Sequence, residues 1–229
     1  MIEDRTVGLA ISGDPARQPL SQQLYRYYSS YHYLDEVALY YRRNPALAFN
    51  AAARKLKTEL LVCLGGDVYI GEVELFRFIR LPYDVPFALA PLYPRRHTVM
   101  QYPEPWSVHE DKPFVSGLFR VAREHLHHHP MPTSPSFSED VLWERSVKDL
   151  GLTFGAVHVP CVHVDHHLPV PRLRKLVWSV IAPERFGQKG PARGLWQAIR
   201  TTVWDFSDSV RGASSAHEAR DLHFVRGEA

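Results

Sequence analysis

Apolar and polar residues alternate in blocks along the first 70 positions of the chain. Three short apolar runs have the length of β-strands and are bounded by turn-forming residues: 6–12, 36–41 and 60–64. Two segments of helical character separate them, 20–31 and 44–57, and the second opens with Asn44-Pro45, which suits a helix start. Strand, helix, strand, helix, strand predicts a parallel, right-handed α/β arrangement.

The composition of the chain changes after residue 70. A helix is expected over 72–79, and a proline-rich stretch from Pro82 to Pro135 is expected to hold strand fragments at 87–91 and 115–121 joined by long loops. The histidine run from His125 to His129 is expected to be an exposed loop. Further helices are predicted over 138–150, 172–181 and 194–210, and strands over 153–159 and 162–165.

These elements predict an α/β fold with a mostly parallel central sheet flanked by helices and a helical C-terminal extension. We assign residues 1–170 to the sheet domain and 171–229 to the extension. The wholly apolar run at 60–64 belongs in the middle of a sheet covered on both faces.

Composition narrows the class of protein. The chain has 229 residues, 45% of them hydrophobic, and only two cysteines, so a disulfide framework is excluded. No window approaches 18 uninterrupted apolar residues, and the acidic start is unlike a secretory signal. We expect a reduced, cytoplasmic protein. The region from Pro171 onward is mildly basic, which fits either a solvated helical surface or a contact with phosphates.

Gly65-Gly66-Asp67 follows the buried strand directly. An acidic residue just past a parallel strand lies at the carboxyl edge of the sheet, where ligands bind in open α/β folds. Its carboxylate could hold Mg²⁺ or Mn²⁺ against a diphosphate, because both ions prefer oxygen ligands. The alternative is an ordinary turn, for which all three residues are suited.

Ser138-Glu139-Asp140 opens the helix predicted over 138–150. Carboxylates at a helix start are stabilised by the helix dipole, which is a sufficient structural explanation. The functional interpretation is a general base that takes a proton from an acceptor hydroxyl.

Cys161-Val162-His163-Val164-Asp165-His166-His167 combines thiol, imidazole and carboxylate groups at alternating positions. The run is similar to the zinc motif of the metallo-β-lactamase fold with Cys161 in place of the first histidine. That fold places its motif early and needs ligands far downstream, so this interpretation is the less favoured one.

Four motifs in order resemble the inverting, family-2-like nucleotide-sugar transferases with the GT-A fold. A helix containing Asn50 and Arg54 leads into the strand that ends at Asp67, and Ser116–Glu124 resembles the family's Gly-Ala-Phe strand. Glu139-Asp140 then opens a helix, and Val159–His166 resembles the family's closing strand. The match covers about Thr6 to His167.

The resemblance implies a role for each matched residue. Asp140 would be the catalytic base, with Glu139 as its neighbour or substitute. Asp67 would bind Mn²⁺ or Mg²⁺, with His166 or His167 as the partner ligand. Ser12, Asp14, Asn50 and Asp67 would lie near the nucleotide, and the aromatic residues Trp106 and Trp143 would contact the acceptor, with core packing as the alternative for Trp143.

One position departs from the family pattern. Gly65 stands where the first acid of the Asp-x-Asp motif is expected. Two functions therefore follow from the resemblance: a metal-dependent inverting glycosyltransferase that uses a nucleotide-diphosphate sugar, or a catalytically silent GT-A-like module that binds a glycan, nucleotide or nucleic-acid partner. A carbohydrate or small-molecule acceptor is favoured, and the basic C-terminal region leaves modified DNA as a further candidate.

Overall fold

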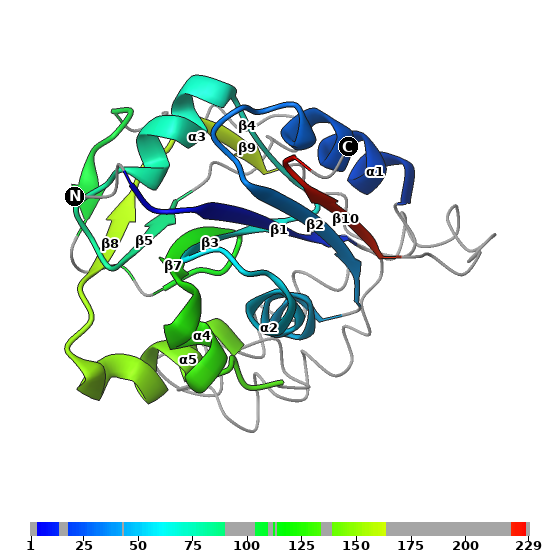
Figure 1. Cartoon of the computed structure of the whole chain (residues 1–229). Helices are drawn as coiled ribbons and strands as arrows, with labels where there is room; N and C mark the ends of the chain where they lie inside the picture. Colours follow the sequence, from blue (N-terminus) through cyan, green and yellow to red (C-terminus); the bar gives the residue numbers. More distant parts are fainter. Residues whose placement is uncertain are drawn as a thin grey trace, which may run out of the picture.

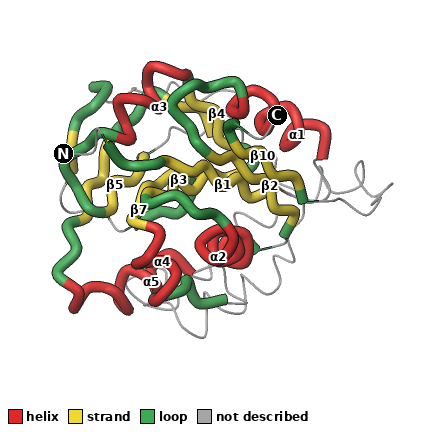
Figure 2. The backbone as a smooth tube through the Cα atoms, viewed as in Figure 1, coloured by secondary structure: helices red, strands yellow, loops and turns green. Residues whose placement is uncertain are grey.

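A computed structural model describes the fold for residues 4–13, 18–42, 44–89, 104–109, 112, 114–133, 139–163 and 221–227. Three layers are visible in Figure 1, with a twisted central sheet between two groups of helices. The same layers are coloured by secondary structure in Figure 2. Within the described ranges, no helix combines the length and apolar character that crossing a bilayer requires.

The central sheet has eight strands in the order β10-β2-β1-β3-β7-β5-β8-β6. Their bounds are Val7–Gly13 (β1), Glu36–Tyr41 (β2), Leu60–Gly65 (β3), Val85–Ala88 (β5), Val108–His109 (β6), Leu118–Ala122 (β7), Phe154–Val157 (β8) and Leu222–Val225 (β10). Strands β1, β2, β3, β5 and β8 run in one direction, and β6, β7 and β10 run against them. The sheet is therefore mixed but mostly parallel, as predicted.

Each face of the sheet carries its own set of helices (Figure 1). Helices α1 (Gln18–Ser29) and α3 (Glu72–Ile79) pack on one face through a cluster that includes Leu24, Tyr28 and Phe78. The opposite face is covered by α2 (Pro45–Lys55), α4 (Arg123–His128) and α5 (Glu139–Val147), which continues as a 3-10 turn over Lys148–Leu150. Apolar residues on both faces explain why the run at 60–64 is wholly apolar.

A second, two-stranded sheet lies beside α1 and α3. Strand β4 (Val68–Ile70) pairs antiparallel with β9 (Cys161–His163). The hydroxyl of Tyr28 fixes β4 to α1, because it accepts a hydrogen bond from the Ile70 amide at 3.0 Å and donates one to the Ile70 carbonyl at 3.4 Å. The turn at Gly66 and Asp67 is therefore held at both ends, by β3 and by β4.

Two sequence-based expectations need correction. Residues Arg123–His128 form helix α4 and not an exposed loop, because Leu126 is buried against α2 and the sheet while His127 and His128 face outward. The end of the expected helical extension, Leu222–Val225, is strand β10, which extends the main sheet beside β2. The helices expected over 172–181 and 194–210, with the basic residues there, lie outside the described residues.

Candidate functional site at the carboxyl edge of the sheet

The predicted nucleotide site lies where β1 and β3 end side by side. Ser12 pairs with Gly65 across the two parallel strands, and the amide of Gly66 donates to the Ser12 carbonyl at 2.9 Å. A Cβ on Gly66 would stand 2.6 Å from that carbonyl oxygen, so a side chain would not fit there without movement of the backbone. Glycine at this position lets the chain turn tightly against β1.

Strand β7 brings a third segment to the same edge. Because β7 runs antiparallel to β3, its first residues lie beside the last residues of β3. The amide of Gly65 donates to the carbonyl of Gly117 at 2.7 Å, immediately before β7 begins. The ends of β1 and β3 therefore meet the Ser116-Gly117 turn at the carboxyl edge. In the sequence, this turn is part of the Ser116–Glu124 motif.

Asp67 occupies the turn between β3 and β4 and is partly exposed. A Cβ on Gly65 would stand 3.0 Å from Asp67 Oδ1. The side chain of an acid at position 65 would therefore start next to the Asp67 carboxylate. With glycine there, Asp67 lacks the neighbouring carboxylate that an Asp-x-Asp motif would supply.

The register of the small sheet connects Asp67 with the histidine-rich run. His163 is the Cα partner of Val68, and the two strands are antiparallel. The chain therefore leaves β9 level with the residue that follows Asp67. His166 and His167, predicted as metal ligands, and Asp14, predicted near the nucleotide, lie outside the described residues. Within the described part of the chain, no three His, Cys, Asp or Glu side chains are grouped closely enough to hold a metal ion.

The two predicted catalytic acids begin α5. Glu139 is 4% exposed and Asp140 is partly exposed. The helix is held in place further along, where Glu144 accepts a hydrogen bond from the Phe114 amide at 3.1 Å and Trp143 packs against Phe119. Because Phe114 is three residues before Gly117, this packing ties α5 to the turn at the carboxyl edge.

Trp143 is a core residue. Its side chain is 0% exposed, its indole N–H donates to the His129 carbonyl at 2.7 Å, and its ring lies among Phe114, Phe119 and Phe154. An acceptor-binding role would require an exposed ring face. The core-packing alternative therefore describes Trp143.

Asn50 is also buried, in a position that links two elements. Its side-chain amide donates to the Met131 carbonyl at 2.8 Å and its side-chain oxygen accepts from the Met131 amide at 2.9 Å. Both polar atoms of the side chain are thus used to hold the segment after α4 against α2. This contact favours a structural role for Asn50 over contact with a nucleotide.

Trp106 lies at the carboxyl end of β8, on the same edge as Ser12. Its amide donates to the His158 carbonyl at 2.7 Å, and the Arg77 guanidinium lies 4.1 Å from the centre of its ring. Its φ of 68° is left-handed, which is uncommon for a large side chain. The ring is partly buried, and its contact with an acceptor stays a prediction.

The cysteine of the histidine-rich run does not resemble a metal ligand. Cys161 is 4% exposed, and burial raises the pKa of its thiol to about 12. The side chain belongs to the apolar cluster beneath α1 and α3, where a cysteine acts as a small buried hydrophobe. Cys63, in the middle of β3, is wholly buried, and burial raises the pKa of that thiol too.

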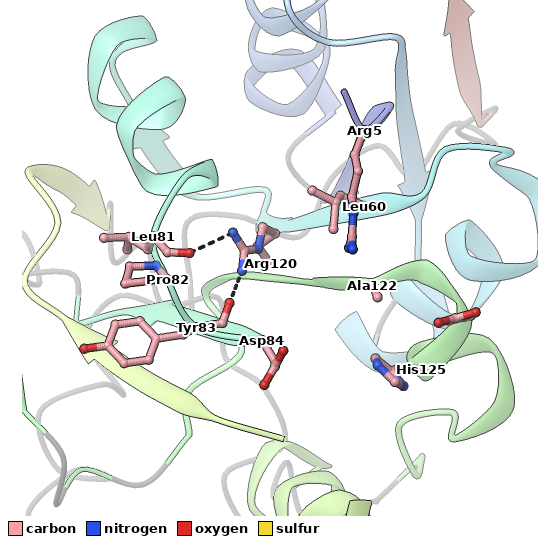
Figure 3. A pocket seen from close by; sticks show the side chains of 10 residues that line it. Arg5, Leu60, Leu81, Pro82, Tyr83, Asp84, Arg120, Ala122 and His125 are labelled. Atoms are coloured by element: carbon pink, nitrogen blue, oxygen red, sulfur yellow. Dashed lines mark hydrogen bonds between the residues drawn. The ribbon is translucent and has the colours of Figure 1, made fainter. Parts of the chain in front are cut away.

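A cavity of about 330 Å³ lies at the opposite, amino edge of the sheet (Figure 3). It is bordered by Arg5 before β1, Leu60 at the start of β3, and Asp84 before β5. Arg120 of β7 is 3% exposed, and its guanidinium donates to the carbonyls of Ile79, Leu81 and Tyr83. Burial lowers the pKa of Arg120 to about 10. These contacts give Arg120 a structural role, since they fix the segment between α3 and β5.

Sequence reasoning missed Tyr28, Gly117 and Arg120 as residues that shape these two edges. The motif around Ser116–Glu124 contained two of them, but periodicity alone gave no sign of which backbone groups they would contact. Tyr28 could be recognised only as an apolar helix position, because its hydroxyl bonds with a strand 42 residues away.

Comparison with solved structures shows the class of fold. The chain is similar to "Mannosyltransferase PcManGT from Pyrobaculum calidifontis in complex with GDP-Man and Mn2+", with a TM-score of 0.52 and 15% identity over 92% of this chain and 76% of that one. A mycobacterial protein matches with a TM-score of 0.54 and 11% identity, over 81% of this chain and 76% of that one. The GT-A-like fold predicted from the motifs is thereby confirmed.

A weaker match is S. aureus TarS 1-349 in complex with UDP-GlcNAc, at a TM-score of 0.46 and 13% identity, covering 89% of this chain and 73% of that chain. No protein-family model matches the sequence, and no curated protein does.

Proposed function

We propose that the protein is a glycosyltransferase that moves a sugar from a nucleotide-diphosphate donor to an acceptor hydroxyl, with inversion at the anomeric carbon and assistance from a divalent cation. The observation that carries the proposal is the meeting of segments at one edge of a GT-A-like sheet. Backbone hydrogen bonds there join Gly66 to Ser12 and Gly65 to Gly117, and β9 ends level with the residue after Asp67. The Pyrobaculum mannosyltransferase of similar fold binds GDP-Man and Mn²⁺.

Asp67 is suited to hold such an ion, since Mg²⁺ and Mn²⁺ prefer carboxylate oxygen. His166 or His167, a few residues beyond the end of β9, would supply a further ligand, and the donor diphosphate and water the remainder. When bound, the ion would neutralise charge on the departing diphosphate. Ser12 and Asp14 would border the nucleotide.

Asp140, which is partly exposed, would take the proton of the acceptor hydroxyl as the new bond forms, with the buried Glu139 beside it as the substitute. The start of a helix favours an ionised carboxylate, which is the form a base requires. Attack from the face opposite the leaving diphosphate inverts the anomeric carbon. Trp106 would contact the acceptor through its ring.

The first experiment measures the melting temperature with a panel of nucleotide diphosphates and nucleotide sugars, with and without Mn²⁺. A ligand of the folded state raises the melting temperature according to its occupancy. We expect one nucleotide class to do so only with Mn²⁺, and Asp67→Asn to remove the shift. Asp149→Asn, an exposed aspartate in the 3-10 turn after α5, is the matched control and should leave the shift intact.

Transfer itself is tested with Asp140→Asn and Glu139→Gln. Loss of nucleotide-diphosphate release, by roughly a hundredfold or more, with nucleotide binding unchanged would identify the base. If Asp67→Asn binds the Mn²⁺-nucleotide complex as well as the wild-type protein does, the metal assignment is wrong.

Gly65 favours a second candidate, a GT-A-like module that binds without catalysis. One carboxylate of the motif is missing, which weakens the metal site. In that case a nucleotide or glycan would bind equally well with and without Mn²⁺, no nucleotide diphosphate would be released, and Asp67→Asn would change neither result.

A further inference from the structure

A row of aromatic rings runs across the surface formed by α1, β4 and α3. Consecutive ring centres are 5.1 Å apart for Phe76 and Tyr33, 5.6 Å for Tyr33 and Tyr31, 5.0 Å for Tyr31 and Tyr27, and 5.3 Å for Tyr27 and Tyr69. Tyr31 is buried beneath the row, whereas Tyr69 is 44% exposed and Phe76 is 37% exposed. We name the four outer rings the aromatic platform: Tyr27, Tyr33, Tyr69 and Phe76.

The aromatic platform is rigidly held. Tyr69 donates a hydrogen bond to the Tyr27 hydroxyl at 3.0 Å, which joins β4 to α1 at the surface. Tyr33 donates to the Glu72 carbonyl at 2.9 Å, and the Arg80 guanidinium lies 3.4 Å from the centre of the Phe76 ring. Rings fixed in this way lose little conformational entropy when they bind a ligand.

Its position links it to the candidate site. Tyr69 is two residues after Asp67, and β4 lies between α1 and α3 on one face of the sheet (Figure 1). The row therefore extends from the turn that carries Asp67, past α1, to the outer surface of α3. An extended ligand that follows the platform would have one end near Asp67.

Charge and chemistry distinguish among possible ligands. Glu72 and Glu74 begin α3, and each carboxylate is close enough to a platform ring to help raise a pKa, Glu72 that of Tyr33 and Glu74 that of Tyr69. These are minor causes beside burial for Tyr33 and the Tyr27 hydrogen bond for Tyr69. Together with the Arg80 guanidinium over Phe76, these two carboxylates leave the platform without the excess of positive charge that favours a polyanion such as nucleic acid or an anionic membrane surface.

A neutral carbohydrate fits these features. The C–H face of a sugar ring packs against an aromatic face, whose π electrons are slightly negative. Tyrosine hydroxyl and carboxylate oxygens accept the hydrogen bonds that sugar hydroxyls donate. The platform also supplies several rings in sequence, which suits a chain of sugars better than a single one.

We propose that the aromatic platform binds an extended, uncharged oligosaccharide chain and so holds a polymeric acceptor with its end at the Asp67 turn. This proposal rests on the proposed glycosyltransferase function, because it names the acceptor class for the same site.

The test is affinity electrophoresis of the full chain in native gels that contain soluble mannan, dextran, xylan or galactan, with a gel lacking polysaccharide as reference. We expect at least one polysaccharide to retard the wild-type protein. Tyr69→Ala and Phe76→Ala should each weaken the retention on the order of tenfold, since each removes an exposed ring from the platform. Tyr69→Phe keeps the ring and should retain most of the binding. Leu47→Ala removes a similarly exposed apolar side chain from α2, on the opposite face, and should change nothing.

Retardation by none of the four polysaccharides, or retention that survives both Tyr69→Ala and Phe76→Ala, would overturn the proposal. A change from dimer to monomer in Tyr69→Ala by light scattering would also overturn it, because the platform would then be a contact between two copies.

The two proposals fail separately. Tyr69→Ala should leave the Mn²⁺-dependent shift in melting temperature with nucleotide unchanged. If the wild-type protein shows no Mn²⁺-dependent shift in melting temperature with any nucleotide but is still retarded by polysaccharide, the transferase proposal is rejected and the glycan site is kept. A Mn²⁺-dependent shift with nucleotide, without retardation by any polysaccharide, would reject the proposal for the aromatic platform alone.

Discussion

Gly65 stands where the sequence resemblance predicts the first acid of an Asp-x-Asp motif. Its missing Cβ would stand 3.0 Å from Asp67 Oδ1 and 3.3 Å from the Gly117 carbonyl oxygen. Gly65 does not have a positive φ, so an L-residue can adopt its backbone conformation. A Cβ at position 65 is accommodated if the Asp67 side chain and the Gly117 carbonyl each give way by a few tenths of an ångström.

We therefore expect Gly65→Asp to raise the affinity for Mn²⁺ on the order of tenfold, because two hard oxygen ligands replace one. Without metal the two carboxylates repel each other, and the unfolding free energy should fall by about 1 kcal/mol at this solvent-accessible turn. Calorimetric titration with Mn²⁺ and melting in chelator measure the two effects. Gly65→Asn has similar size without the charge and should show neither; an equal gain with Asn would reject this explanation.

A second residue-scale prediction concerns the histidine pair at the end of β8. The rings of His109 and His158 lie 4.7 Å apart, edge to face, and neither His109 Nε2 nor His158 Nδ1 has a hydrogen-bond partner within the described part of the chain. Burial lowers the pKa of His158, with His109 and Lys112 contributing in the same direction and a backbone bond at Leu89 opposing it.

Because the folded-state pKa is lowered, the unfolded chain binds this proton more readily. His158 should therefore lower the unfolding free energy as the pH falls from about 6.5, the unfolded value, through the lower folded-state pKa. Urea unfolding at a series of pH values measures the slope. His158→Gln should flatten the curve in that window, whereas His127→Gln, an exposed histidine on α4, should not. An unchanged slope in His158→Gln would contradict the assignment.

At the scale of elements, the hydroxyl of Tyr28 holds β4 against α1. Tyr28→Phe leaves the Ile70 amide without its hydroxyl acceptor in a buried position, so we expect a loss of about 1–2 kcal/mol in unfolding free energy. Amide exchange in β4 should quicken more than in β3. Tyr33→Phe removes a hydroxyl whose hydrogen bond is exposed and should cost less than about 0.5 kcal/mol. Equal losses for the two variants would show that Tyr28 has no special role.

The elements that the sequence predicted well are those with strong local signals. Strand β1, helix α1, strand β2, helix α2 and strand β3 lie within a residue or two of the expected ranges, and α3 matches at both ends. Strand β4 was missed because three residues are too few to establish a period. Strand β10 was missed because only its pairing with β2, across most of the chain, makes it a strand.

The residues of the candidate site likewise divide into those that a local sequence signal identifies and those that only tertiary contacts identify. The Gly66-Asp67 turn could be located, because a buried parallel strand fixes which edge its end reaches. The buried positions of Asn50 and Trp143 could not, since the same residue types suit a ligand or a core and only the contacts with Met131 and His129 distinguish them. The aromatic platform joins rings from three elements, and no window of sequence contains them together.

At the scale of the whole molecule, the last described segment of the chain adds an edge strand to the central sheet, beside elements from the first half of the chain. Strand β10 pairs with β2, and Arg226 anchors it: its backbone amide donates to the Asp35 carbonyl at 2.9 Å, and its guanidinium donates to the carbonyls of Leu34 and Tyr31. Leu34 and Tyr31 are buried residues, and both hydrogen bonds from the guanidinium are partly buried. The C-terminal strand thereby fixes the turn between α1 and β2, which also carries the platform residue Tyr33.

Arg226→Ala should consequently destabilise the whole fold. The Leu34 carbonyl loses its guanidinium donor and the Tyr31 carbonyl keeps only the Leu34 amide, so we expect a loss of about 1–2 kcal/mol in unfolding free energy. The Arg42–Asp221 ion pair at the other end of β10 is the matched control. Its atoms are 2.7 Å apart, but both side chains are about a third exposed, so Arg42→Ala should cost less than about 1 kcal/mol. Denaturant unfolding of both variants decides the matter. If Arg226→Ala is no more destabilising than Arg42→Ala, the Arg226 contacts of β10 do not stabilise the fold as proposed.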